Sequence, residues 1–178
     1  MAEQIRERFD AEATWLPFDL HPEYPPEGIP RAELHARYGE RAHEHVRTVF
    51  ERAGLAYNPP PDVVPNSRAA LRLGELARGH GLHQELHDRV MDAYWAEGRN
   101  IGDRDELRTL AADVRLPSDD VERVLASDEH LDLVLGSTRQ AQLIGINGIP
   151  AFLLDRRLLV LGAQPFHLFE QAFAQLES

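Results

Sequence analysis

The sequence contains no cysteine and no lysine, and it has neither a long apolar run nor a secretory leader. Without cysteine the chain cannot form a disulfide, a thiolate zinc site, an iron–sulfur cluster or a thiol nucleophile. No run of about 18 apolar residues is present to span a bilayer. The start, MAEQIRERFD, lacks the basic and apolar blocks of a signal peptide. We therefore expect a cytoplasmic protein with no membrane partner.

The charge of the chain is strongly acidic. It has 30 Asp and Glu residues against 19 basic residues, all of them Arg, for a formal net charge of −11. A nucleic-acid-binding protein needs a positive surface to contact phosphates, so we expect no nucleic-acid partner. The length of 178 residues and the hydrophobic content of 43% suit one domain, or one domain with an insertion, around a buried core.

Helical and extended patterns follow one another along the first two thirds of the chain. Ile5 and Phe9 are four residues apart, which is typical of an amphipathic helix, whereas residues 13–21 alternate in the manner of a strand. A loop rich in Pro leads to a helix predicted over 31–53, and residues 56–65 predict an extended loop. Five further helices are predicted within 66–144, each bounded by capping residues or Gly.

The C-terminal segment has a different pattern. Residues 149–155 and 157–163 are two short apolar runs joined at Asp155-Arg156, which predicts a hairpin of buried strands. Pro165 then begins a last helix with a Phe-rich apolar face. A strand separated from a hairpin and a helix by a block of helices predicts an α/β sheet that carries an all-α insertion.

Several segments, taken in order, resemble the DsbA-like thioredoxin family. They are WLPFDLHPEYPPEG (15–28), NSRAALRLGELA (66–77), AYWAEGRNIGD (93–103) and GINGIPAFLLD (145–155), followed by LGAQP (161–165). The resemblance is strongest to the FrnE-type branch, which neighbours the 2-hydroxychromene-2-carboxylate isomerases and the kappa-class glutathione transferases. It implies a thioredoxin-like α/β fold formed by residues 1–30 and 141–178, with an inserted helical domain over 31–140.

The resemblance also implies where the chemistry of the family would lie. In that family a C-x-x-C, with Ser in the isomerases, ends the first strand and faces a cis-proline. Ile149-Pro150 matches the cis-proline position, so the resemblance implies a substrate groove at Asn147, Gly148, Ile149 and Pro150. A trans proline that begins a strand is the alternative interpretation of the same residues. Asn66 is a candidate ligand contact by the same resemblance, although a helix cap explains this residue by itself.

The chain departs from the family pattern at its start. Met1 falls in the family's first helix, so the N-terminal strand and the C-x-x-C are missing from the sequence. Three explanations stay open: an internal Met of a longer protein, a true truncation whose gap another segment or a second copy fills, or a relative with a non-redox role. The open sheet edge that results predicts a homodimer.

The function expected from the resemblance is that of a DsbA/FrnE-like thiol–disulfide oxidoreductase family member. As a cysteine-free chain it is expected to be inactive in redox chemistry and to hold no catalytic residue. Two alternatives stay open, a non-catalytic thioredoxin-fold binding module and a glutathione-dependent isomerase or transferase. The implied partners are a thiol or disulfide peptide, or glutathione as substrate or ligand, and we expect no resident cofactor.

One histidine pattern has the spacing of a metal site. His83 and His87 are four residues apart, as metal ligands on a helix can be, and His80 precedes them. The segment HQELH differs from HExxH because its acid stands in the third position. Solvated histidines on a helix face are the better interpretation, so we expect no metal.

Overall fold

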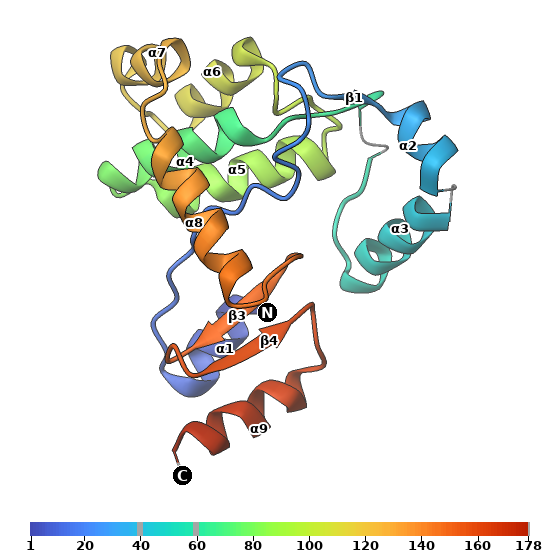
Figure 1. Cartoon of the computed structure of the whole chain (residues 1–178), viewed down its shortest axis with the longest axis vertical. Helices are drawn as coiled ribbons and strands as arrows, with labels where there is room; N and C mark the ends of the chain where they lie inside the picture. The colour runs from blue at the N-terminus through green and yellow to red at the C-terminus, as the bar shows by residue number, and fades with distance from the viewer. Residues whose placement is uncertain (39–40, 59–60, 178) are drawn as a thin grey trace. The chain divides into compact units, whose positions relative to one another are not determined.

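The computed structural model describes residues 1–38, 41–58 and 61–177. Its contacts divide the chain into a sheet unit, Met1–Leu20 with Gly136–Ser178, and a helical unit, His21–Leu135. The predicted limits of the inserted domain, 31 and 140, remain a prediction. The elements drawn in Figure 1 are α1 (Ala2–Phe9), β1 (Ile29–Pro30), α2 (Arg31–Tyr38), α3 (Arg41–Ala53), β2 (Val63–Val64), α4 (Arg68–Gly79), α5 (His83–Trp95), α6 (Arg104–Asp113), α7 (Ser118–Ala126), α8 (Leu131–Leu143), β3 (Ala151–Leu154), β4 (Leu158–Leu161) and α9 (Phe166–Leu176).

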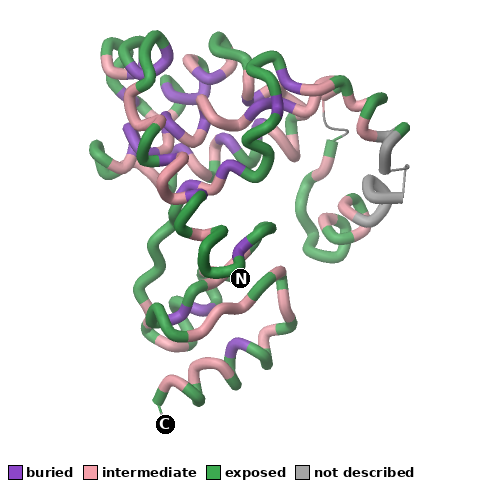
Figure 2. Tube along the Cα trace, in the orientation of Figure 1, coloured by how far each residue is buried: buried purple, intermediate pink, exposed green. Residues whose placement is uncertain are grey.

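The core of the helical unit lies among α4, α5, α6 and α7. Each of these helices carries apolar residues three and four apart, so one face of each turns inward. Leu73, Leu86, Leu107, Leu110 and Val124 are almost completely buried there. Figure 2 shows the buried positions gathered on these four helices. The helical unit therefore has a continuous apolar interior.

A side chain caps α6, whereas Ser67, Leu82 and Pro117 precede α4, α5 and α7 without a side-chain cap, so the predicted start signals are confirmed only in part. Asp103 caps α6, since its carboxylate accepts hydrogen bonds from the backbone N–H groups of Asp105 and Glu106. Glu106 does not form a capping box with Asp103, because its carboxylate pairs with Arg99 and the Asp103 N–H donates to the Asn100 carbonyl. Within the helix predicted over 31–53 the structure describes α2 and α3, and residues 39–40 between them lie outside the described residues.

A short antiparallel pair, β1 with β2, also belongs to the helical unit. It lies partly within the extended loop predicted over 56–65. Gly28 precedes β1 with φ +80°, and a Cβ at this position would lie 2.5 Å from the Val64 carbonyl oxygen. Only glycine fits this close approach.

The strand predicted over 13–21 is wrong. No strand forms there in the described chain, and Leu16 and Leu20 are exposed. Pro17 and Asp19 are buried instead, and the Asp19 N–H donates to the Thr138 hydroxyl at 2.9 Å. Because proline has no N–H to give to a ladder, the segment is held by this side-chain contact and not by strand pairing.

The predicted hairpin is present as β3 and β4 of the sheet unit. The strands pair antiparallel with Ala151 opposite Leu161 and Leu154 opposite Leu158. Asp155 and Arg156 turn the chain with positive φ angles of 47° and 54°. One face of the hairpin packs on α9, where the buried Phe169 meets the Phe152 ring edge to face, 5.0 Å between centroids.

Candidate functional site

Residues 147–150 connect α8 to β3 in the sheet unit. All four are exposed, and the Ile149–Pro150 peptide bond is cis. The buried Ile146 precedes the segment and β3 follows it, so both of its ends are held. The Ile149 side chain is 58% exposed, which is unusual for an isoleucine beside a strand. This segment is therefore a fixed, accessible apolar surface.

The hydrogen bonds of the hairpin determine which backbone groups stay accessible. The Gly162 N–H donates to the Pro150 carbonyl at 2.8 Å, so Pro150 faces β4. Ile149 lies before the ladder, which begins at Ala151, and the cis bond joins it to Pro150. β3 pairs with β4 alone in the part of the chain that the structure describes, and Ile149 has no protein hydrogen-bond partner there.

The two asparagines that were predicted to lie near a ligand both form hydrogen bonds within the protein. Asn147 donates from Nδ2 to the Gly145 carbonyl at 3.3 Å, as a turn residue does. Asn66 is buried in the helical unit, where Nδ2 donates to the Tyr24 carbonyl at 2.7 Å and Oδ1 accepts from the Arg68 N–H at 3.0 Å. The predicted cap is thus formed by Asn66, and its role as a ligand contact stays a prediction.

The chemistry open to residues 147–150 follows from the side chains around them. Residues 141–154 contain no ionisable group. The segment therefore has no acid, base or nucleophile of its own, and it offers backbone hydrogen bonds and apolar side chains instead. Such a surface suits binding and does not supply a catalytic group.

The histidines with metal-like spacing lie in the helical unit. The rings of His83 and His87 are stacked with centroids 6.2 Å apart, and both are half-buried, not solvated as predicted. Burial lowers the pKa of both imidazoles, and the Arg78 charge lowers that of His83 further. His80 pairs with Asp120 at 3.1 Å. Among the described residues no group of three or more His, Cys, Asp or Glu could hold a metal ion.

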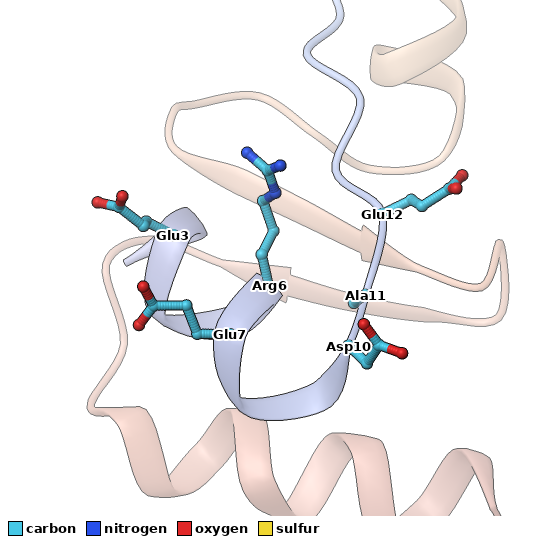
Figure 3. A pocket seen from close by; sticks show the side chains of 6 residues that line it. All are labelled: Glu3, Arg6, Glu7, Asp10, Ala11 and Glu12. Atoms are coloured by element: carbon cyan, nitrogen blue, oxygen red, sulfur yellow. The ribbon is translucent and has the colours of Figure 1, made fainter.

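A hollow lies along α1 in the sheet unit. Glu3, Arg6, Glu7, Asp10 and Glu12 line it together with Ala11. Figure 3 shows these side chains splayed apart, without a common point toward which they converge. The hollow has the composition of an exposed helix face and brings no chemistry together.

The sequence prediction of the site stopped at Pro150, whereas the accessible edge continues along β3. Ala151 pairs opposite Leu161 and Leu153 opposite Leu159, and neither was predicted as a site residue. The alternation of strand residues after Pro150 could have predicted which of them face the accessible edge. That prediction needs the edge that Pro150 faces, which is known only from the folded hairpin.

Comparison with known proteins gives consistent matches along the chain. Residues 1–174 match the DSBA-like thioredoxin domain. The protein YwbO of Bacillus subtilis is 26% identical over 167 residues, covering 93% of this chain and 82% of its own. A probable DsbA oxidoreductase from Streptomyces coelicolor, known from a crystal structure, is 30% identical with a TM-score of 0.85, covering 95% of this chain and 76% of that one.

A more distant structural match points to the same fold. A 2-hydroxychromene-2-carboxylate isomerase structure gives a TM-score of 0.75 at 16% identity, covering 98% of this chain and 86% of that one. At this identity the match concerns the fold alone. Together the matches confirm the predicted thioredoxin-like fold class. Within the described ranges no helix is long and apolar enough to cross a membrane.

Proposed function

Because this chain belongs to the family of the DSBA-like thioredoxin domain, we propose that it is a non-redox member that binds the backbone of an extended peptide or of glutathione. The observation that carries the proposal is that Ile149 is exposed and that its N–H and C=O have no hydrogen-bond partner among the described residues. An extended ligand satisfies such groups by strand-like pairing. The exposed Ile149 side chain supplies apolar contact beside them.

The absence of sulfur chemistry supports binding over exchange. Thiol–disulfide exchange begins with a thiolate that attacks a disulfide sulfur, and a second thiol then resolves the mixed disulfide. The only sulfur atoms of this sequence are the thioethers of Met1 and Met91. Neither can form a thiolate. The residues of this chain therefore cannot carry an exchange step, whereas ligand binding needs no thiol.

Peptide and glutathione share an amide backbone, so titration with each separates them. We expect saturable binding of one or both, followed by fluorescence anisotropy for a labelled peptide and by calorimetry for glutathione. Ile149→Asp places a charge beside the accessible backbone and should weaken binding about tenfold or more, since burying an unpaired charge is costly. Leu143→Asp is the matched control, because Leu143 is also largely exposed in the sheet unit. Binding that is absent, or that responds equally to both variants, would contradict the proposal.

A homodimer is part of the same proposal. The open edge of β3 supports it, because unpaired strand edges favour association. Light scattering at micromolar concentration measures the mass directly. A value near the chain mass of 20.2 kDa would overturn this part and leave ligand binding untouched.

A further inference from the structure

The chain has four asparagines, Asn58, Asn66, Asn100 and Asn147, and asparagine is among the thermolabile residues of proteins. It loses its side-chain amide when the backbone nitrogen of the next residue attacks the side-chain carbonyl carbon. This attack needs an exposed asparagine, a next residue that leaves room beside its nitrogen, and a backbone N–H outside any hydrogen bond. Asn147 is followed by glycine, the residue that leaves most room.

The local structure of Asn147 and Gly148 meets these requirements. Both residues are exposed. Among the described residues the Gly148 N–H donates to no protein acceptor, so the attacking nitrogen is not held in a hydrogen bond. A Cβ at Gly148 would meet no heavy atom within 4 Å, so the space beside this nitrogen is open. The hydrogen bond from Asn147 Nδ2 to the Gly145 carbonyl is long for its type, at 3.3 Å, and holds the amide weakly.

Each of the other three asparagines lacks one requirement. Asn58 precedes a proline, whose nitrogen carries no hydrogen to lose. Asn66 is buried, and both ends of its amide are hydrogen-bonded. Asn100 precedes the buried, branched Ile101, which crowds the approach to its nitrogen. All four asparagines belong to the described residues, and among them Asn147 alone combines the right neighbour with the right surroundings.

We propose that Asn147 is a site of deamidation. The Gly148 backbone nitrogen gives its proton to solvent and forms a bond to Cγ of Asn147, while the bond from Cγ to Nδ2 breaks and ammonia leaves. A water molecule then opens the cyclic imide at one of its two carbonyls. The product is an aspartate, or an isoaspartate in which the main chain runs through Cγ. One water is taken up for one ammonia released, and water is the only co-reactant.

The reaction changes the charge of a segment that has none. Residues 141–154 contain no ionisable group, and the new carboxyl is ionised at neutral pH. The charge arises two residues before Ile149, and isoaspartate also adds a methylene to the backbone there. This consequence rests on the proposed function, because a ligand bound at Ile149 lies beside the new carboxylate and desolvates it. Deamidation therefore weakens ligand binding.

The modification is tested by incubating the purified protein in mildly alkaline buffer and following each asparagine by peptide mapping with mass spectrometry. We expect Asn147 to convert about tenfold or more faster than Asn66 and Asn100, with isoaspartate among the products. Gly148→Ala should slow the conversion clearly, and the open space and ordinary φ of Gly148 allow this methyl group in the fold. A stable Asn147, or a rate that Gly148→Ala leaves unchanged, would overturn the proposal.

The consequence for binding is tested with a variant that fixes the charge of the product. Asn147→Asp should weaken binding of the labelled peptide about tenfold. Gln142→Glu makes the same change from amide to carboxylate at an exposed residue of α8 and is the matched control. Equal effects of the two variants would overturn the consequence and leave the modification site standing. If the unmodified protein binds neither peptide nor glutathione, the proposed function fails, and the mass measurement still decides whether Asn147 is modified.

Discussion

The helical unit and the sheet unit differ in how completely they cover their apolar residues. Leu107 and Leu110 of the helical unit are almost fully buried, whereas Leu153 and Leu161 of the hairpin are nearly half exposed. A helix needs one covered face, and its neighbours provide that cover. A two-stranded sheet has two faces and two edges, and it is marginal in water when they stay open. The proposed binding surface lies in the hairpin, whose apolar residues are the less covered of the two.

The largest effect is expected in the helical core. Leu110→Ala should lower the free energy of unfolding by about 4 kcal/mol, because it leaves a cavity among tightly packed helices. Leu153→Ala should cost less than about 1 kcal/mol, since that side chain is already partly in water. Urea unfolding measures both. Equal costs would remove the distinction between the two regions.

Phe169 tests whether the sheet unit has a core of its own. It is fully buried on α9, and Phe169→Ala should destabilise the sheet unit by about 3 kcal/mol. Hydrogen exchange should show lost protection in β3 and β4 and unchanged protection in α4 to α7. If the helical amides lose protection to the same extent, the two regions unfold as one.

Arg72 is a buried charged residue of the helical unit. Its guanidinium donates to the carbonyls of Val124 and Ser127 at the end of α7, and to that of Glu129 at 2.7 Å. Arg72→Met should cost about 2 kcal/mol, because buried carbonyls lose their donors. Thermal or urea unfolding measures this cost. The stability of Arg72→Lys is expected to lie between that of the unmodified protein and that of Arg72→Met. A neutral Arg72→Met would show that these hydrogen bonds contribute nothing to the helical core.

The pH dependence of stability should reflect the histidines on α5. Burial lowers the folded-state pKa of His83 and His87, so the unfolded chain binds protons more readily. The free energy of unfolding should therefore fall as the pH drops from about 7.5 to about 5.5, through the ordinary histidine range. Replacing both residues with Gln should reduce this slope, whereas His167→Gln, at an exposed site, should not. Urea unfolding midpoints at the two pH values measure this pH dependence. If the double replacement leaves the pH dependence unchanged, His83 and His87 are not its cause.

The smallest effect is expected from the exposed ion pairs. Arg108 contacts Asp105 and Glu122 on the surface, and these contacts lower the pKa of Glu122. Because solvent and salt screen such charges, Arg108→Ala should leave the urea midpoint unchanged within error. A clear loss of stability would mean that the helical unit depends on its surface charges as well as its core.

Local rules predicted much of the fold from the sequence, and long-range contacts account for the failure. Asp103 as a helix cap and Asp155-Arg156 as a hairpin turn follow from short-range chemistry. The strand prediction over 13–21 failed because the buried position of Asp19 depends on its contact with Thr138, which lies 119 residues away in the sequence. Alternation alone does not show which face meets the core.

The sequence predicted only part of the candidate site. The resemblance pointed to Ile149-Pro150, and apolar composition pointed to the hairpin. The extension of the edge through Ala151 and Leu153 depends on the hydrogen bond from Gly162 to Pro150, which fixes the facing of every later residue. That hydrogen bond joins two segments of the chain, and the sequence of neither segment indicates it.

Amide hydrogen exchange of the hairpin, measured with and without the labelled extended peptide, tests the proposed binding site. We expect fast exchange for Ile149, Ala151 and Leu153 in the free protein and clear protection of Ile149 once the peptide is added. Phe152 and Leu154, which face β4, should be protected in both states. Equal protection of all five amides in the free protein would mean that the backbone of this segment is already covered, and it would contradict the proposed function.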